Sequence, residues 1–169
     1  TKPHEGALPA GVQWKTFRSA AAGQDVSYYI YLPPQYRADD ENRYPVIYNL
    51  HGNGKTSFQG FQDMELLHEG IQDGRWPPMI IVRPNGGRTT FYKDSYDGKI
   101  PLETVVIKEL IPHIDRSYRT IAKREGRCIE GYSMGGRGAT RLAMKYPQLF
   151  CSLNCQAGNV PRTSEGFDP

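Results

Sequence analysis

The sequence predicts an α/β fold, in which a mainly parallel central sheet is flanked by helices. Short apolar runs alternate with segments whose apolar residues recur at helical spacing, the order typical of a sheet covered by helices. One run, residues 46–50, is compact and apolar, as expected of a central strand buried on both faces. A length of 169 residues suits one domain, so residues 1–169 are treated as a single unit.

The N-terminal part predicts an antiparallel start to the sheet. Residues 12–18 and 26–32 are rich in β-branched and aromatic side chains, and Gly23-Gln24-Asp25 forms the expected turn between these two strands. The strand at residues 46–50 follows a polar loop and runs into His51-Gly52-Asn53-Gly54, where the glycines let the chain turn sharply.

The middle part alternates helix, strand and helix. Residues 64–72 are expected to be helical, with Gly74 just past the end. A strand at 79–83 is stopped by Pro84. From 102 to 118 apolar residues recur at helical spacing, and Pro112 inside that pattern predicts a kink or a break.

The C-terminal part repeats the strand–helix–strand order. Residues 127–130 are expected to form a short strand that leads directly into Gly131, and a helix is expected at 139–146, ended by Pro147. Residues 149–156 predict a further strand, and the chain beyond Gly158 is expected to be a loop or a tail.

Composition excludes several classes of protein. The net charge of +3 comes from 21 basic and 18 acidic residues, and the basic ones are scattered, which argues against nucleic acid as a partner. The longest apolar stretch, residues 79–82, is far too short to span a bilayer, so no membrane association is expected.

The three cysteines do not form a disulfide framework. Cys151 and Cys155 on one strand would be roughly 13 Å apart, too far for a bridge. Their spacing lacks companion ligands, so no metal site is expected. With Cys128, they are predicted to be buried free thiols.

The strongest chemical signal is Gly131-Tyr132-Ser133-Met134-Gly135. A Gly-x-Ser-x-Gly pattern alone is weak, but here a predicted strand precedes it and a helix follows, the setting that a nucleophile elbow requires. Small residues flank the serine because its turn is strained, and the helix N-terminus favours developing negative charge. The alternative is a glycine-rich turn with an incidental serine.

A second signal is the loop after residues 46–50. Its backbone can aim an N–H at a carbonyl oxygen, and Asn53, with Gly54 close behind, would complete an oxyanion hole with the N–H of Met134. Gly54, Tyr132 and Tyr92 are expected to contact the substrate. The alternatives are a purely structural turn for the loop and an ordinary polar surface around Tyr92; His51 is expected to orient the loop rather than act as a base.

These motifs, in this order, resemble the putative-esterase family of α/β-hydrolases, which includes feruloyl and acetyl xylan esterases, esterase D proteins and mycolyltransferases. The resemblance covers residues 12–158, and its segments are Tyr29-Ile30-Tyr31-Leu32-Pro33, residues 45–52, 109–115 with 118–120, residues 131–136 and 146–150. It implies an α/β-hydrolase fold, ester hydrolysis by Ser133 without cofactor or metal, and a secreted location. The loop at 84–97 is most similar to the feruloyl esterase branch.

The histidine and acid that such a serine needs are not where the resemblance places them. In α/β-hydrolases they follow the serine, but no histidine follows Ser133, and the only later acids are Glu165 and Asp168. The domain is therefore expected to be incomplete, with the fold truncated at its C-terminal side. We expect the isolated polypeptide to be unstable, or to associate with a complementary C-terminal fragment or another chain.

Three explanations of the missing base remain open: a fragment of a longer esterase, which the intact motifs favour, a short form whose base comes from another chain, and an inactive relative that only binds. For an active protein, the substrate would be a small-molecule or polysaccharide-linked ester of feruloyl, acetyl or short-chain type. Transfer of the acyl group to an alcohol rather than to water is a further alternative, since the elbow serves both reactions equally.

Overall fold

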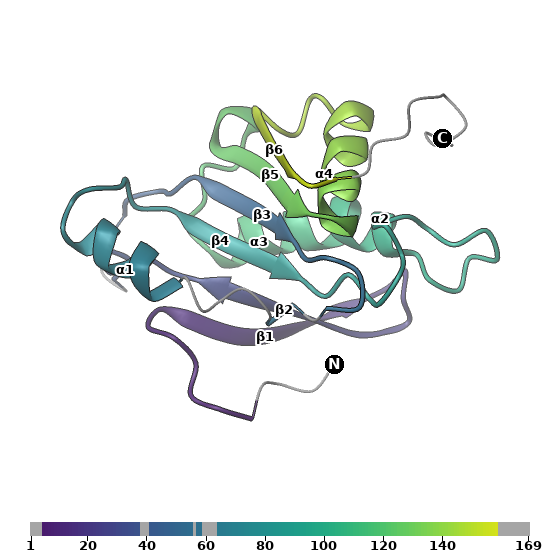
Figure 1. Ribbon diagram of the computed structural model, residues 1–169, viewed down its shortest axis with the longest axis horizontal. Helices are drawn as coiled ribbons and strands as arrows, with labels where there is room; N and C mark the ends of the chain where they lie inside the picture. Colours follow the sequence, from purple (N-terminus) through teal and green to yellow (C-terminus); the bar gives the residue numbers. More distant parts are fainter. Residues whose placement is uncertain (1–4, 38–40, 56, 59–63, 159–169) are drawn as a thin grey trace.

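The structure is a computed structural model that describes residues 5–37, 41–55, 57–58 and 64–158. A single six-stranded sheet with the strand order β1-β2-β4-β3-β5-β6 runs through it (Figure 1). The strands are β1 (Val12–Ser19), β2 (Gln24–Tyr31), β3 (Val46–Leu50), β4 (Ile80–Pro84), β5 (Arg127–Tyr132) and β6 (Ser152–Gln156).

The direction of the strands confirms a mainly parallel sheet with an antiparallel start. β1 pairs antiparallel with β2, and β2 antiparallel with β4. β4, β3, β5 and β6 are parallel to one another. In the β3–β5 pair Leu50 lies opposite Gly131, so the two loops that carry the chemical motifs leave the sheet side by side.

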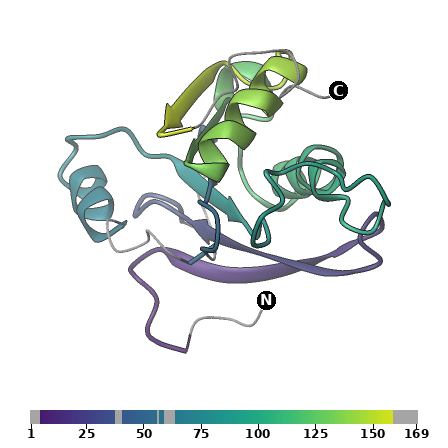
Figure 2. The same cartoon turned by 45° about the vertical axis from the view of Figure 1, so that its right-hand side comes forward.

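Helices cover both faces of the sheet (Figure 2). On one face α1 (Met64–Gln72) packs through Ile71 against Tyr29, Tyr31 and Ile81. The larger core lies on the other face, where Tyr48, Ile129 and their neighbours meet the helical segment 102–117 and α4 (Met134–Lys145). Among the described helices none is long and apolar enough to cross a membrane.

The helix predicted at 102–118 forms without the expected break. It consists of α2 (Leu102–Thr104), the π-helical η2 (Val105–Leu110) and α3 (Ile111–Ser117). Pro112 lies in the first turn of α3, where a missing N–H is tolerated. The helix accommodates the proline by widening before it, and the Ile111 N–H reaches back to the Val106 carbonyl.

Two boundaries near the serine motif differ from the prediction. α4 begins at Met134 rather than at 139, because packing against β3 overrides the low helix propensity of Gly135, Gly136 and Gly138. β6 begins at Ser152 rather than at 149. A short 3₁₀ helix, η3 (Arg124–Gly126), directly precedes β5.

The prediction of buried thiols is wrong. Cys151 and Cys155 are exposed and Cys128 is half-buried, although all three are free. The cause is the position of β6, the outermost strand in the described sheet, whose five residues are all exposed.

Candidate active site

Ser133 occupies a strained turn between β5 and α4, as the motif predicted. Its φ of 53° and ψ of −114° lie outside the regions that L-residues favour. Two backbone hydrogen bonds hold this conformation: the Ser133 N–H donates to the Gln156 carbonyl at 2.8 Å, and its carbonyl accepts from the Arg137 N–H at 3.0 Å. Strand β6 therefore supports the turn from one side and α4 from the other.

The glycines around Ser133 are required by close backbone approach. A Cβ added at Gly135 would lie 1.9 Å from the Leu50 carbonyl oxygen, and one at Gly131 would lie 2.3 Å from the Gly135 carbonyl oxygen. Real Cβ atoms essentially never come that close to another heavy atom. The Gly-x-Ser-x-Gly spacing thus lets the start of α4 lie directly against the end of β3.

The loop after β3 reaches Ser133. A Cβ built at Gly52 would lie 3.6 Å from the Ser133 Cβ, so the two predicted motifs meet. Within the described chain no acceptor is found for the Asn53 N–H, whereas the Gly54 N–H donates to the Arg88 carbonyl at 2.9 Å. Of the two candidate donors in this loop, Asn53 is the one that fits.

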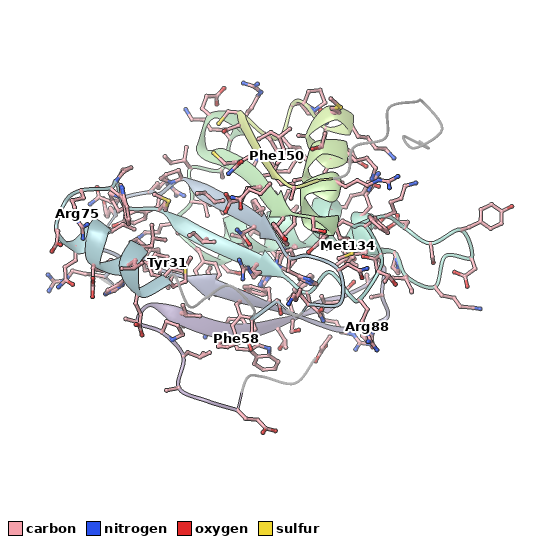
Figure 3. All side chains as sticks on the ribbon, in the orientation of Figure 1. Tyr31, Phe58, Arg75, Arg88, Met134 and Phe150 are labelled. Carbon is pink, nitrogen blue, oxygen red and sulfur yellow. The ribbon has the colours of Figure 1, made fainter. Side chains whose placement is uncertain are left out.

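Met134 brings the second candidate donor. As the first residue of α4, its N–H has no acceptor inside the helix, while its side chain is buried in the core. Figure 3 shows Met134 where α4 begins, close to the end of the central strands. The N-terminus of this twelve-residue helix also carries a partial positive charge directed toward Ser133.

His51 is a structural residue of the loop, as expected. It is 4% exposed, its Nε2 accepts from the Gly86 N–H at 2.9 Å, and its Nδ1 lies 2.9 Å from the Gly52 carbonyl. An Nε2 that accepts requires a neutral ring with the proton on Nδ1, which then donates to Gly52. Burial lowers the pKa of His51, which favours this neutral form.

Tyr92 does not lie where a substrate could touch it. Its side chain is 0% exposed and its hydroxyl donates to the His51 carbonyl at 3.2 Å. The ring fills the space left by Gly86 and Gly138, each of whose Cβ atoms would clash with it. The predicted contact between Tyr92 and substrate is therefore wrong, because the loop after β4 folds inward and buries this side chain. Tyr92 instead packs beneath the loop after β3, which its hydroxyl holds at His51. Tyr132 is different, since it is 57% exposed and adjoins Ser133.

An ion-pair cluster, missed in the sequence, anchors Tyr92 to α4. Arg141 donates to the Tyr92 carbonyl at 2.6 Å and pairs with Glu103, which is 6% exposed. Glu103 also pairs with Lys145 and accepts from the Tyr146 hydroxyl at 2.6 Å. Tyr92 and Glu103 lie far from α4 in sequence, and no local pattern marks them as partners of its residues.

No described histidine is placed to activate Ser133. On α1 the Nδ1 of His68 lies 3.3 Å from the Tyr31 hydroxyl, and on α3 the Nε2 of His113 lies 3.0 Å from the Tyr28 hydroxyl. The Ser133 hydroxyl has no hydrogen-bond partner among the residues that the structure places. Glu165 and Asp168 fall outside the described residues. In the described ranges no three His, Cys, Asp or Glu side chains gather as a metal site.

Comparison with known proteins assigns the family. The family model described as "Putative esterase" matches residues 19–165. The chain belongs to this esterase family. Esterase Rv1288 of Mycobacterium tuberculosis is 37% identical over 146 residues, which make up 84% of this chain and 31% of that protein. The endo-1,4-beta-xylanase/feruloyl esterase of Xylanibacter ruminicola is 33% identical over 168 residues, 94% of this chain and 23% of its own.

Solved structures place the chain in the α/β-hydrolase fold. A ferulic acid esterase is 31% identical, with a TM-score of 0.75 over 84% of this chain and 58% of that one. The feruloyl esterase module from Clostridium thermocellum, complexed with sinapinate, has the same TM-score at 21% identity, over 92% of this chain and 57% of its own. The chain thus spans under a third of the two curated relatives and somewhat over half of these two solved chains.

Proposed function

We propose that this esterase-family chain carries the nucleophile and the oxyanion hole for hydrolysis of a carboxylic ester. The observation that carries the proposal is the convergence of the strained Ser133 with the loop after β3, whose Gly52 packs against it. Strained backbone of this kind persists only where the surroundings over-determine it, and it clusters at active sites.

In the proposed reaction the Ser133 hydroxyl attacks the ester carbonyl carbon. The carbonyl oxygen becomes an oxyanion that accepts from the N–H groups of Met134 and Asn53, neither of which has an acceptor among the described residues. The bond from the carbonyl carbon to the alcohol oxygen of the substrate then breaks, that oxygen takes the proton that the base removed from Ser133, and water hydrolyses the acyl-serine. The proton of Ser133 must pass to a base that lies outside the described residues.

For the substrate we propose an ester of a hydroxycinnamic acid such as ferulic acid. Two supports come from the relatives, since the Xylanibacter protein is a feruloyl esterase by name and a solved ferulic acid esterase is 31% identical. The third is local: the exposed ring of Tyr132 lies beside Ser133 and over Gly52, where it offers an aromatic face to a planar acyl group.

Hydrolysis assays with an added base test whether Ser133 is the nucleophile. The chain is incubated with p-nitrophenyl acetate or methyl ferulate, with and without imidazole, which can take the serine proton in place of a histidine. Hydrolysis above that of imidazole alone is expected for the wild type and for Ser152→Ala, an exposed serine on β6, but not for Ser133→Ala. Equal rates for the wild type and Ser133→Ala would contradict the proposal.

A binding role is the second candidate, favoured because both ring nitrogens of His51 are already hydrogen-bonded and no other described histidine is placed to activate Ser133. In that case ferulate would bind without turnover, and imidazole would change nothing. Equilibrium binding of ferulate to Ser133→Ala, measured beside the hydrolysis assay, distinguishes the two functions: binding with no imidazole-dependent hydrolysis by the wild type supports the second.

A further inference from the structure

Two thiols meet beside the outer strand of the sheet. Cys128 lies on β5 and Cys151 lies directly before β6, and their Sγ atoms are 4.0 Å apart. The backbones are tied at the same point, because the Cys151 N–H donates to the Arg127 carbonyl at 2.9 Å and Cys128 lies opposite Ser152 in the parallel register.

The backbone spacing suits a disulfide. Neighbouring strands lie about 4.8 Å apart and one residue advances about 3.3 Å, so Cα atoms offset by one position are roughly 6 Å apart, within the roughly 4.4–6.8 Å that bridged cysteines need. The Sγ atoms must approach by about 2 Å to reach bonding distance, which side-chain rotation can supply. Besides its contact with Cys128, the Cys151 thiol donates to the Glu125 carbonyl at 3.4 Å, and because a thiol is a weak donor, little is lost when it turns.

The third cysteine provides a natural contrast. Cys155 is exposed like Cys151, but it lies four residues further along, roughly 13 Å from it on an extended strand. No thiol is close to it in the part of the chain that the structure places. Exposure alone therefore does not distinguish the two residues, whereas a neighbouring thiol does.

We propose that Cys128 and Cys151 form a reversible disulfide site. The oxidant is a low-molecular-weight disulfide, such as glutathione disulfide. The exposed Cys151 thiolate attacks one of its sulfurs and releases one thiolate, and Cys128 then attacks the Cys151 sulfur of the mixed disulfide and releases the second. Two protein thiols are oxidised and one small disulfide is reduced to two thiols, which take up the two protons that the protein thiols lose.

The bond would act on the support of the serine turn. β6 is exposed along its whole length, and its Gln156 carbonyl accepts from the Ser133 N–H. A covalent link between the start of β6 and the body of β5 ties the edge strand to the sheet, which slows its local opening. Reduction of the same bond restores the free edge.

The test uses glutathione disulfide and mass spectrometry. Wild type and Cys155→Ser should each lose about 2 Da without keeping glutathione on this pair, and dithiothreitol should reverse the change. Trypsin cuts between Cys128 and Cys151 but not between Cys151 and Cys155, so the linked peptides from Cys155→Ser identify the bond. Amide exchange in residues 152–156 should be slower in the oxidised Cys155→Ser form than in the reduced one.

Variants that lack one cysteine of the pair serve as controls. Cys151→Ser should form no internal bond, and Cys128→Ser should keep a glutathione adduct on Cys151. The proposal is overturned if Cys155→Ser collects only glutathione adducts, or if the wild-type bond involves Cys155. Because the readout is mass and exchange, the result is independent of whether the chain hydrolyses esters.

Discussion

At the scale of single residues, the candidate site depends on one strained backbone held by close neighbours. The conformation of Ser133 costs on the order of 1–3 kcal/mol in isolation. Its hydrogen bonds to Gln156 and Arg137 and the absence of a side chain at Gly135 offset that cost. The serine motif is therefore a packing requirement as much as a chemical one.

Gly135→Ala tests that requirement. The new methyl would meet the Leu50 carbonyl oxygen at 1.9 Å, so β3 and α4 must separate, and we expect a loss of about 3 kcal/mol or more of unfolding free energy. Gly98→Ala is the matched control, since that glycine has open space around it and a φ of 70°, and it should cost about 1–2 kcal/mol. Urea denaturation measures both, and equal losses would refute the account.

His51 predicts how stability depends on pH. Burial lowers its pKa below the ordinary value of 6.5 in the folded chain. Between the folded and unfolded pKa values the unfolded chain binds more protons, so the contribution of His51 to the free energy of unfolding is fully present above about pH 6.5 and is lost as pH falls below it toward the folded pKa. His113, whose pKa burial also lowers, adds to the same slope.

His51→Gln should reduce that slope. Glutamine keeps an acceptor near the Gly86 N–H but does not titrate, so the variant should be less stable than wild type at about pH 7.5 yet lose less between about pH 7.5 and 5.5. His113→Gln in the same background should flatten the curve further. An unchanged slope in the His51 variant, measured by urea denaturation, would show that His51 is not a buried neutral ring.

At the scale of elements, a row of hydrogen-bonded polar side chains crosses the sheet near the C-terminal ends of its parallel strands. Arg83 on β4 donates to Asn49 on β3 at 2.8 Å, Asn49 donates to Glu130 on β5, and Asn154 on β6 donates weakly to Glu130 at 3.4 Å. Arg83, Asn49 and Glu130 each lie just before a loop of the candidate site. We interpret the row as a brace that fixes the relative positions of the strand ends.

The two asparagines give a matched pair of variants. Asn49→Ala removes a bond from both Arg83 and Glu130, of which Arg83 is 8% exposed, and should cost about 1–3 kcal/mol of unfolding free energy. Asn154→Ala, on the exposed edge with a single long bond, should cost less than about 0.5 kcal/mol. Comparable losses for the two, again in urea, would argue against a brace.

The sequence predicted best those helices and strands whose ends are marked by a local pattern. The bounds of β3 and α1 agree with the sequence because a dense apolar run and a clear helical period end there abruptly. The start of α4 and the π-helical turn before Pro112 were missed, since both depend on packing rather than propensity. For the same reason the burial of Tyr92 beneath the His51 loop could not be read from its polar surroundings in sequence.

At the scale of the whole molecule, the sheet order brings the two motif loops together. Adjacent parallel strands β3 and β5 place both loops at one edge, which the alternation of strands and helices made predictable. The contacts across the site were not predictable, because Gly86, Arg141 and Gln156 reach it from distant parts of the chain.

The edge of the sheet predicts where the molecule opens first. β6 is exposed and, in the described chain, pairs on one side only, whereas β3 lies between two partners. Amide hydrogen exchange should therefore be faster in residues 152–156 than in 46–50, and association of the chain should increase with its concentration. Equal protection of the two strands, with a concentration-independent monomer, would contradict this expectation.

The most direct test of the central claim, that Ser133 is the nucleophile, is covalent labelling by a fluorophosphonate in the presence of imidazole. Intact mass and peptide mapping should find one adduct per chain, located on Ser133, present in Ser152→Ala and absent in Ser133→Ala. An unlabelled wild-type chain, or an adduct that persists in Ser133→Ala, would contradict the account.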